Sequence, residues 1–280
     1  MSAAARNPAE VESSFAATLR SRGILRLLVV RELRGRYAGS GAGMFWNIIH
    51  PIILVGMYIL VFSRIMGAKL GDGGGGLYVV HLVSGILPWI FFSEIVTRST
   101  GTLVENASYL KKTVIPEEVL FLGVALTSFL THFTGLVFLT AVLAVLRYPE
   151  VPPTEFLLAL ALSLPVLLAL GALAVGVGMI LSVLHLLLRD IGQIVQIALN
   201  LLFWAVPIVY LPSIVPERLQ HLLQFNPVLP YFSVIQKLYG SPDVLFNPDA
   251  FYPMLVYPFL FFLGGLHFIR KNRSEILDRL

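Results

Sequence analysis

Long apolar stretches divide the chain into segments of about membrane-spanning length. A bilayer core about 30 Å thick needs roughly 20 apolar helical residues per crossing. Six stretches have that length and few charges, and none shows the strict alternation of an outer-membrane barrel. The sequence therefore predicts an all-α membrane protein with six transmembrane helices. These are approximately Met44–Ser63, Leu77–Thr97, Val119–Leu146, Phe156–Leu184, Ile191–Leu211 and Phe251–Ile269.

A shorter apolar stretch, Ile24–Val30, precedes the first span and is flanked by arginines. It is too short to cross a bilayer, so we expect an interfacial helix there. The Arg-rich leader before Met44 disfavours a cleavable signal peptide. The pattern thus predicts a cytoplasmic tail with an interfacial helix over 1–43, a transmembrane domain over 44–269 and a cytoplasmic tail over 270–280.

The basic residues indicate which way the spans run. Six spans place both termini on one side, and the segments on that side hold 15 Lys and Arg residues against five in the alternate loops. The positive-inside rule then places both termini in the cytoplasm. The counted inner segments are 1–43, 98–118, 185–190 and 270–280.

Two connections between spans have distinctive compositions. The outer segment 212–250 holds six of the 17 prolines among apolar residues, which is too apolar for a free loop. We expect short broken helices there, packed on protein or lining a polar cavity at the outer membrane boundary. The inner segment 98–118 is polar, and a short helix within it would present a charged face to a cytoplasmic partner.

Composition removes most other classes of protein. The chain is 57% hydrophobic and 13% charged, has a net charge of only +4 and lacks cysteine, so disulfides, thiolate metal sites and nucleic-acid binding are not expected. It has no P-loop, no G-x-S-x-G, no H-E-x-x-H and no Asp-x-Asp, and its six histidines are dispersed. We therefore expect no bound cofactor or metal, and a transport subunit rather than an enzyme.

Two features inside the predicted spans each allow two interpretations. Glu94 lies about one turn from the predicted inner end of its span and is either a proton or ion site or a carboxylate paired with Arg98 at i+4. Two pairs of small residues on the fourth span allow another helix to approach closely, within the subunit or across a dimer. These pairs are Ala172 with Gly176 and Ala174 with Gly178.

Aromatic residues gather beside prolines near the ends of several spans. Their faces stack on sugar rings while their polar tips form hydrogen bonds, so they are suited to line a path for a glycan. Their position alone favours an interfacial aromatic belt instead, whereas the recurrence of proline beside them favours the path. The candidates for a substrate path are Trp46, Trp89, Phe91, Phe92, Trp204 and Tyr210.

Several short motifs, in this order and spacing, resemble the permease of bacterial type-2 ABC exporters for cell-surface polysaccharide. They extend over nearly the whole chain from about residue 20, with Gly41-Ala42-Gly43 as a departure where a larger apolar residue is expected. The motifs are Arg36-Tyr37-Ala38-Gly39-Ser40 with Trp46 and Pro51, Pro88-Trp89-Ile90-Phe91-Phe92, Arg189-Asp190, Pro207-Ile208-Val209-Tyr210 and Asn226-Pro227.

The resemblance implies a transporter of two permease copies and two copies of a separate ATP-binding subunit, which binds ATP and Mg. It also implies that segment 98–118 contains a coupling helix, that 212–250 forms outer gate helices, and that the cargo is a lipid-linked O-antigen, capsule or teichoic acid. The residues expected to contact the ATP-binding partner are Glu105, Tyr109, Lys111, Lys112, Arg189 and Asp190.

Such a cargo has an anionic head and a long hydroxylated chain, so an exporter needs cations at the cytoplasmic interface. Arg34, Arg36 and Tyr37 are placed for that capture, or alternatively for anchoring to anionic lipid. Two other functions remain open from the sequence: a drug or lipid ABC exporter permease, and, with no catalytic set to support it, a membrane-embedded glycan-processing enzyme.

Overall fold

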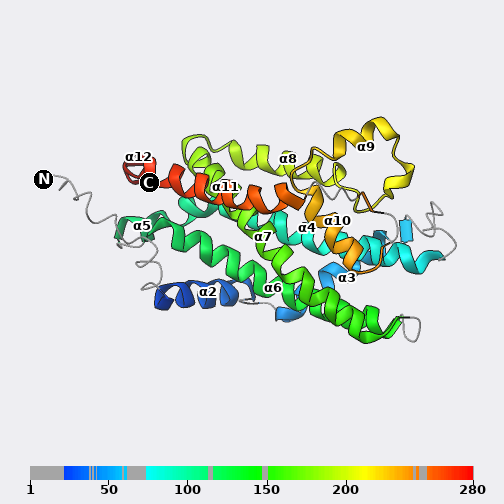
Figure 1. Ribbon diagram of the computed structural model, residues 1–280. Coiled ribbons are helices and arrows are strands. Elements are labelled where there is room, and N and C mark those ends of the chain that lie inside the picture. Colours follow the sequence, from blue (N-terminus) through cyan, green and yellow to red (C-terminus); the bar gives the residue numbers. More distant parts are fainter. Residues whose placement is uncertain are drawn as a thin grey trace, which may run out of the picture.

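All regular structure that the computed structural model describes is helical. The description covers residues 22–37, 39, 41, 43–58, 60–61, 74–112, 116–146, 151–241, 244–245 and 251–279. Within these ranges the helices run roughly side by side along the long axis of the molecule (Figure 1).

Four helices are long and apolar enough to cross a bilayer. They confirm the second, third, fourth and sixth predicted spans, each with some extension at the ends. The helices are α4 (Gly74–Glu105), α6 (Glu117–Leu146), α7 (Pro153–Leu187) and α11 (Phe251–Lys271).

The other two predicted spans correspond to shorter helices. The 3-10 turn η2 (Gly43–Phe45) leads into α3 (Trp46–Tyr58), and positions 59, 62 and 63 of the predicted span lie outside the described residues. α8 (Ile191–Trp204) has 14 residues, so the prediction that helix continues to Leu211 was wrong. Pro207 explains the early end, because it lacks an N–H and its ring clashes with the carbonyl four residues earlier.

Three short or amphipathic helices lie at one end of the molecule. α2 (Arg22–Tyr37) confirms an N-terminal helix but is longer than the predicted Ile24–Val30. α5 (Ala107–Lys112) is the short helix expected within 98–118. Both lie at the left-hand end of Figure 1, together with the C-terminal α12 (Arg273–Arg279).

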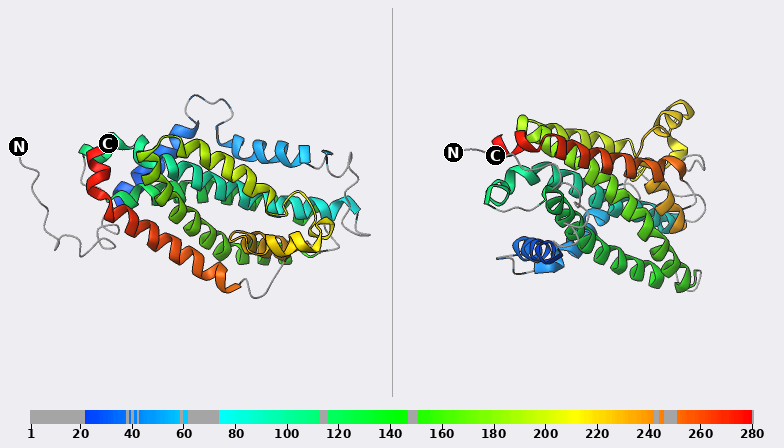
Figure 2. Two further views of the ribbon diagram at one scale, coloured as in Figure 1. Left: turned by 90° about the horizontal axis from the view of Figure 1, so that it is seen from above. Right: turned by 60° about the vertical axis from the view of Figure 1, so that its left-hand side comes forward.

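The opposite end carries the broken helices expected within 212–250. They are the 3-10 turn η5 (Pro212–Ile214), α9 (Glu217–Leu223) and α10 (Leu229–Leu238). Prolines stand in the first turn of η5 and α10, where their missing N–H groups leave no helical bond unmade. α10 packs on α4 and α7, whereas α9, in yellow, stands out from the bundle in the right-hand view of Figure 2.

α7 is the centre of the packing and lies between α4 and α11. Small residues make this possible: a Cβ at Gly265 of α11 would stand 2.7 Å from the carbonyl oxygen of Gly176, and a Cβ at Gly178 would collide with Ser99 of α4. Both small-residue faces of α7 thus pack within the subunit, which resolves the alternative left open by the sequence.

This close approach predicts opposite effects of alanine at two adjacent glycines. Gly265→Ala would force α11 away from α7 and lower the free energy of unfolding by about 1–3 kcal/mol. Gly264→Ala is the matched control, because open space surrounds a Cβ there and alanine favours a helix by about 1 kcal/mol. Thermal unfolding in detergent measures both, and equal stability of the two variants would contradict this packing.

Candidate functional site

A carboxylate on α4 forms the centre of a polar cluster between three helices. Glu94 Oε1 accepts a hydrogen bond of 2.8 Å from Ser128 Oγ, and its Oε2 lies 2.6 Å from His132 Nε2, both on α6. Arg36 of α2 forms an ion pair with the same carboxylate. Glu94 therefore connects α2, α4 and α6.

A second ion pair extends this cluster along α2. Arg98, one turn after Glu94 on α4, pairs with Glu32 of α2 and also lies 3.4 Å from Glu94. Two carboxylates thus face two guanidinium groups and one imidazole. We call Glu32, Arg36, Glu94, Arg98, Ser128 and His132 the inner ion cluster.

α4 continues beyond the predicted inner end of the second span. It runs to Glu105, so Glu94 stands eleven residues, or about 17 Å, before the end of the helix. The pairing of Glu94 with Arg98 is confirmed. Ionisable groups inside an apolar bundle are costly unless paired, and the arrangement supplies Glu94 with opposite charge and two further hydrogen-bond partners.

A separate contact links α2 to the short helix α5. The Arg31 guanidinium lies 4.9 Å from the ring centre of Tyr109 and donates a 3.1 Å hydrogen bond to Asn106 Oδ1. A cation over an aromatic face is favourable by about 0.5–1 kcal/mol at exposed sites. α5 is therefore attached to α2, which is in turn attached to α4 and α6 through the inner ion cluster.

Most residues predicted to contact a partner are exposed at this end of the molecule. Glu105, Tyr109 and Lys111 are exposed on and beside α5, whereas the side chain of Lys112 lies outside the described residues. Arg189 and Asp190 are exposed in the turn between α7 and α8, which Figure 1 places at the same end. The contact with a partner itself stays a prediction.

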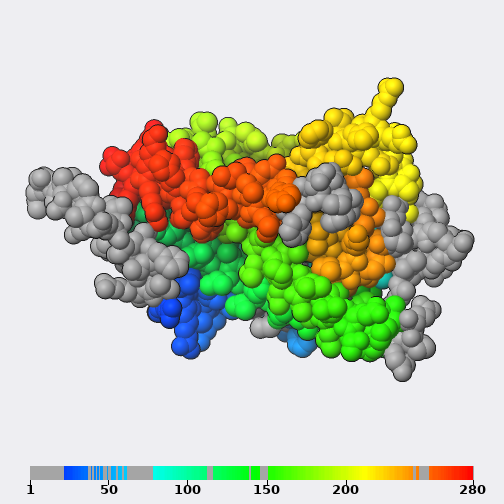
Figure 3. Space-filling view, viewed as in Figure 1, coloured from blue at the N-terminus to red at the C-terminus, as the bar shows by residue number. Residues whose placement is uncertain are grey.

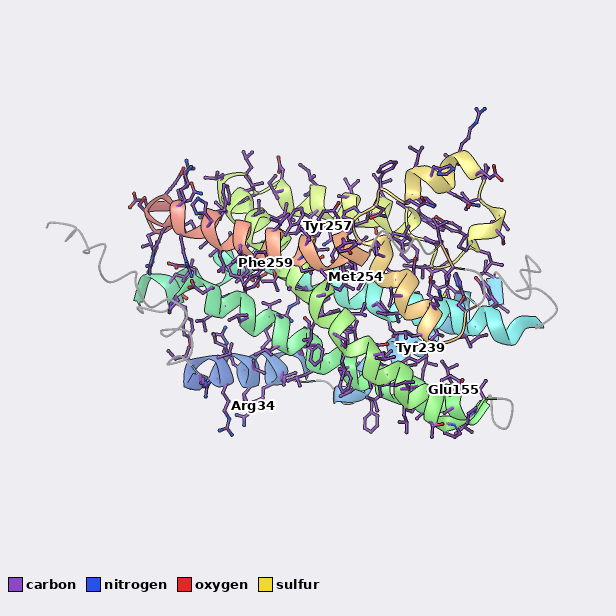
Figure 4. The ribbon with its side chains drawn as sticks, viewed as in Figure 1. Arg34, Glu155, Tyr239, Met254, Tyr257 and Phe259 are labelled. Carbon is purple, nitrogen blue, oxygen red and sulfur yellow. The ribbon has the colours of Figure 1, made fainter. Side chains whose placement is uncertain are left out.

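The residues predicted to line a substrate path do not share one surface of this chain. Trp46 and Trp204 are exposed, and the side chain of Arg34 points away from the helices (Figure 4). The side chain of Tyr37 lies outside the described residues, and Tyr210 is partly buried, with its hydroxyl donating to the carbonyl oxygen of Trp204 over 2.8 Å.

The aromatic residues of the second span are buried. Trp89 has ring centroids of Phe92, Phe203 and Phe232 within 5.4 to 6.1 Å, so it packs α4 onto α8 and α10. Phe91, also buried, packs toward α6. These residues hold helices together in the conformation observed, and their role in a substrate path stays a prediction.

A second polar cluster fixes the outer end of α4. Gln236 of α10 donates to the carbonyl oxygens of Pro207 and His81 over 3.1 and 3.3 Å. His81 Nε2 lies 3.3 Å from the carbonyl oxygen of Tyr210, and His81 Nδ1 lies 2.9 Å from Ser241 Oγ. We call His81, Gln236 and Ser241 the outer anchor.

Local sequence explains how Ser241 reaches this position. Gly240 follows α10 with φ +85°, and the amide of Ser241 donates to the carbonyl of Gln236. This is a Schellman helix end, for which glycine is the favoured residue because a Cβ is costly at positive φ. The turn brings Ser241 back to α4 beside His81.

Further buried hydroxyls attach α10 and the irregular segment after α8 to the long helices. Tyr231 donates to the carbonyl oxygen of Met254 at 2.8 Å, Tyr239 lies 2.7 Å from Thr140 Oγ1, and Tyr78 donates to the carbonyl oxygen of Val209 at 2.7 Å. Burial raises the pKa of Tyr231 and of Tyr239 above the ordinary phenol value, so both stay neutral. Figure 4 shows Tyr239 and Met254 on adjacent elements.

Several members of these clusters were not singled out from the sequence. Ser128 and His132 stand four residues apart and share a helix face, which is the one local signal that they act together. No local sequence pattern pointed to Glu32, His81 or Gln236, because their partners are distant in the chain. No group of His, Asp or Glu within the described ranges is arranged to hold a metal ion.

The family profile and the named relatives that match this chain all belong to transporters, and the matches extend over most of the chain. The profile of the ABC-2 type transporter family matches residues 24–239. The chain is 28% identical to the "O-antigen export system permease protein RfbA" of Klebsiella pneumoniae, over 73% of this chain and 75% of that protein.

Two further relatives come from other bacteria. The protein of the same name from Myxococcus xanthus is 29% identical, over 82% of this chain and 84% of that protein. The "Polysialic acid transport protein KpsM" of Escherichia coli is 24% identical, over 72% and 75% respectively.

The inner ion cluster predicts non-additive effects of neutralising its members. Glu94→Gln leaves Arg36 without its anion and is expected to lower the free energy of unfolding by about 1–3 kcal/mol. The double variant Glu94→Gln/Arg36→Gln should lower the free energy of unfolding by less than the sum of the losses in the two single variants. Ser93→Ala is the control, because its hydroxyl bonds only within α4. Additive losses in thermal unfolding would contradict the pairing.

The outer anchor predicts that Gln236→Leu leaves two carbonyl oxygens without their donor. The expected loss of stability is about 1–3 kcal/mol. Gln224→Leu serves as the control because Gln224 is exposed at the end of α9. Limited proteolysis within 212–241 should become faster in Gln236→Leu alone, and unchanged cleavage would show that the anchor does not hold α10.

Proposed function

Because the chain belongs to the ABC-2 type transporter family, we propose that it is the permease subunit of an ATP-driven exporter that moves a lipid-linked polysaccharide across the bacterial inner membrane. The cargo would be an O-antigen, a capsule or a teichoic acid. One observation carries this proposal: relatives named for export of O-antigen and transport of polysialic acid match about three quarters of their own length, 75% to 84%.

The proposed orientation places α2, α5 and α12 in or beside the cytoplasmic leaflet and α9 and α10 at the outer face. Both termini would then be cytoplasmic, with six crossings that include α3 and α8. The excess of Lys and Arg in the inner segments, 15 against five, supports this direction. The division of short helices between the two ends agrees with it (Figure 1).

The proposed partners are a second copy of this chain and two copies of an ATP-binding subunit. ATP and Mg would be bound by that subunit, because the sequence has no P-loop with which to hold nucleotide phosphates. The chain itself would catalyse no reaction. α5 would be the coupling helix, with Glu105, Tyr109, Lys111 and Lys112 toward the partner and Arg189 with Asp190 as a second contact.

The observed contacts supply a continuous route for movement through the subunit. A displacement of α5 would pull α2 through Arg31, and α2 would act on α4 and α6 through Arg36 and Glu94. α4 also carries His81, thirteen residues or about 20 Å from Glu94. The outer anchor would therefore transfer the movement of α4 to α10 and open the outer gate segment.

Capture of the cargo head would fall mainly to Arg34. Arg36 is occupied by Glu94, whereas Arg34 is exposed and points outward from α2. The glycan would then pass between two permease copies, along aromatic residues that include Trp46, Trp204 and Tyr210. Trp89, Phe91 and Phe92 would join this path only after α4 has moved, since they are buried now.

Reconstitution with the ATP-binding subunit in liposomes tests this function. ATP-dependent transfer of a lipid-linked glycan is expected, and Tyr109→Ala should reduce it about two- to fivefold by removing the contact of the α5 ring with Arg31. Ser108→Ala, exposed on the same helix, is the control. Glycan transfer without ATP or partner would refute the proposal. ATPase stimulation by small amphiphiles without glycan transfer would favour a drug or lipid exporter instead.

A further inference from the structure

Two buried carboxylates at the start of α6 are paired with arginines from the other end of the chain. Glu117 Oε1 lies 2.9 Å from Arg273 Nε, and Glu118 Oε1 lies 3.2 Å from Arg270 Nη2. Both glutamates are almost inaccessible, with relative exposures of 2% and 6%. Figure 3 shows α12 and the end of α11, in red, against the green surface at the start of α6.

Glutamates in the first turn of a helix are common, because they complement the positive end of the helix dipole while facing water. Glu117 and Glu118 are instead turned into the protein, where an unpaired carboxylate is costly. Arg270 and Arg273 offset part of that cost. The start of α6 is thus held by the C-terminal segment.

The C-terminal segment is itself built to hold these arginines in place. The chain turns at Asn272, whose side chain donates to the carbonyl oxygen of Phe268 at 2.7 Å, and α12 begins at the next residue. Ile276 on α12 is 1% exposed, and α12 packs on α7. α12 therefore connects the core helix α7 to the start of α6.

The start of α6 lies close in the chain to the proposed coupling helix. Glu117 comes only five residues after Lys112, the last residue of α5, and Leu110 of α5 is buried. With so few residues between the two helices, the start of α6 limits how far the end of α5 can move. α5 is thus attached to α2 through Arg31 and joined along the chain to the start of α6.

We propose that Arg270 and Arg273 are positioning residues for ATP-driven export, and that α12 clamps the start of α6 so that α5 faces the ATP-binding partner at a fixed height and angle. This inference rests on the proposed function for its transport consequence, whereas the clamp itself is a property of the permease alone. α12 then serves as the inner counterpart of the outer anchor.

The chain provides a matched control on α12 itself. Arg279 also forms an ion pair, at 3.0 Å, but with Glu275 one turn earlier on the same short helix, and both side chains are about half exposed. This pair connects α12 to no other helix. Arg279→Gln therefore removes an arginine and an ion pair from α12 without releasing the start of α6.

The test uses the full permease in lipid nanodiscs, alone and in complex with its ATP-binding subunit. In the permease alone, Arg270→Gln/Arg273→Gln should speed amide hydrogen exchange in residues 107–112 by about fivefold or more, because the start of α6, to which α5 is joined, is released. In the complex, the same variant should still hydrolyse ATP but transfer several-fold less glycan per ATP. Arg279→Gln should match the unmodified chain in both measurements.

Exchange of the charges provides a rescue. Glu117→Arg with Arg273→Glu re-forms the pair in reverse and should restore slow exchange in α5, whereas Glu117→Arg alone should not. Unchanged exchange in 107–112 after loss of both arginines would overturn the inference. So would a loss of ATP hydrolysis and transport in the same proportion, since that marks a general loss of folded complex.

The two proposals fail separately. If the loss of Arg270 and Arg273 loosens α5 while the unmodified complex transfers no glycan, the clamp stands and the export function falls. If the unmodified complex exports glycan and the double variant leaves both exchange in α5 and glycan transfer per ATP unchanged, the clamp falls and the export function stands.

Discussion

The need to neutralise a carboxylate inside an apolar helical bundle determines much of this structure. Glu94 lies on α4, the most buried of the four helices that are long and apolar enough to cross a bilayer. In its most apolar stretch, 78% is buried inside the protein. Lone charges are poorly tolerated at such positions. Arg36 forms an ion pair with this carboxylate, and His132 lies within hydrogen-bond distance of it. These contacts fix α2 and α6 to α4. The position of α2 thus depends on the ion pair between Arg36 and Glu94 of α4.

Seen along its length, α4 joins two different kinds of contact. Toward one end it forms ion pairs, which are strong over short distances and can exchange partners as helices shift. Toward the other it forms hydrogen bonds to backbone carbonyls through the outer anchor, which keep a specific geometry. Between them Trp89 is packed in an aromatic cluster with α8 and α10. α4 therefore joins the inner ion cluster to the segment that carries α10 through a packed and continuous helix.

The features that could be predicted from sequence are those encoded within a single segment. Run length and hydropathy identified the four long helices, the polar stretch 98–118 predicted the short α5, and the prolines of 212–250 predicted broken helices. The pairings across the fold could not be predicted. Arg36 and Glu94 are 58 residues apart, and Glu94 and His132 are 38 apart, so nothing local links them. The early end of α8 was missed because apolar composition outweighed Pro207 in the prediction.

The short length of α8 has a consequence for the barrier that the molecule presents to a polar solute. Fourteen helical residues rise about 21 Å, roughly 9 Å less than the hydrocarbon layer. The backbone carbonyls that follow are satisfied by side chains of Asn226, Gln236, His81 and Tyr78 rather than by helix. Tyr78, His81 and Gln236 are fully buried, so these hydrogen bonds lie inside the protein and not on its lipid-facing surface. The non-helical chain after α8 is therefore shielded from acyl chains, and a polar solute could reach these groups only after the helices have moved apart.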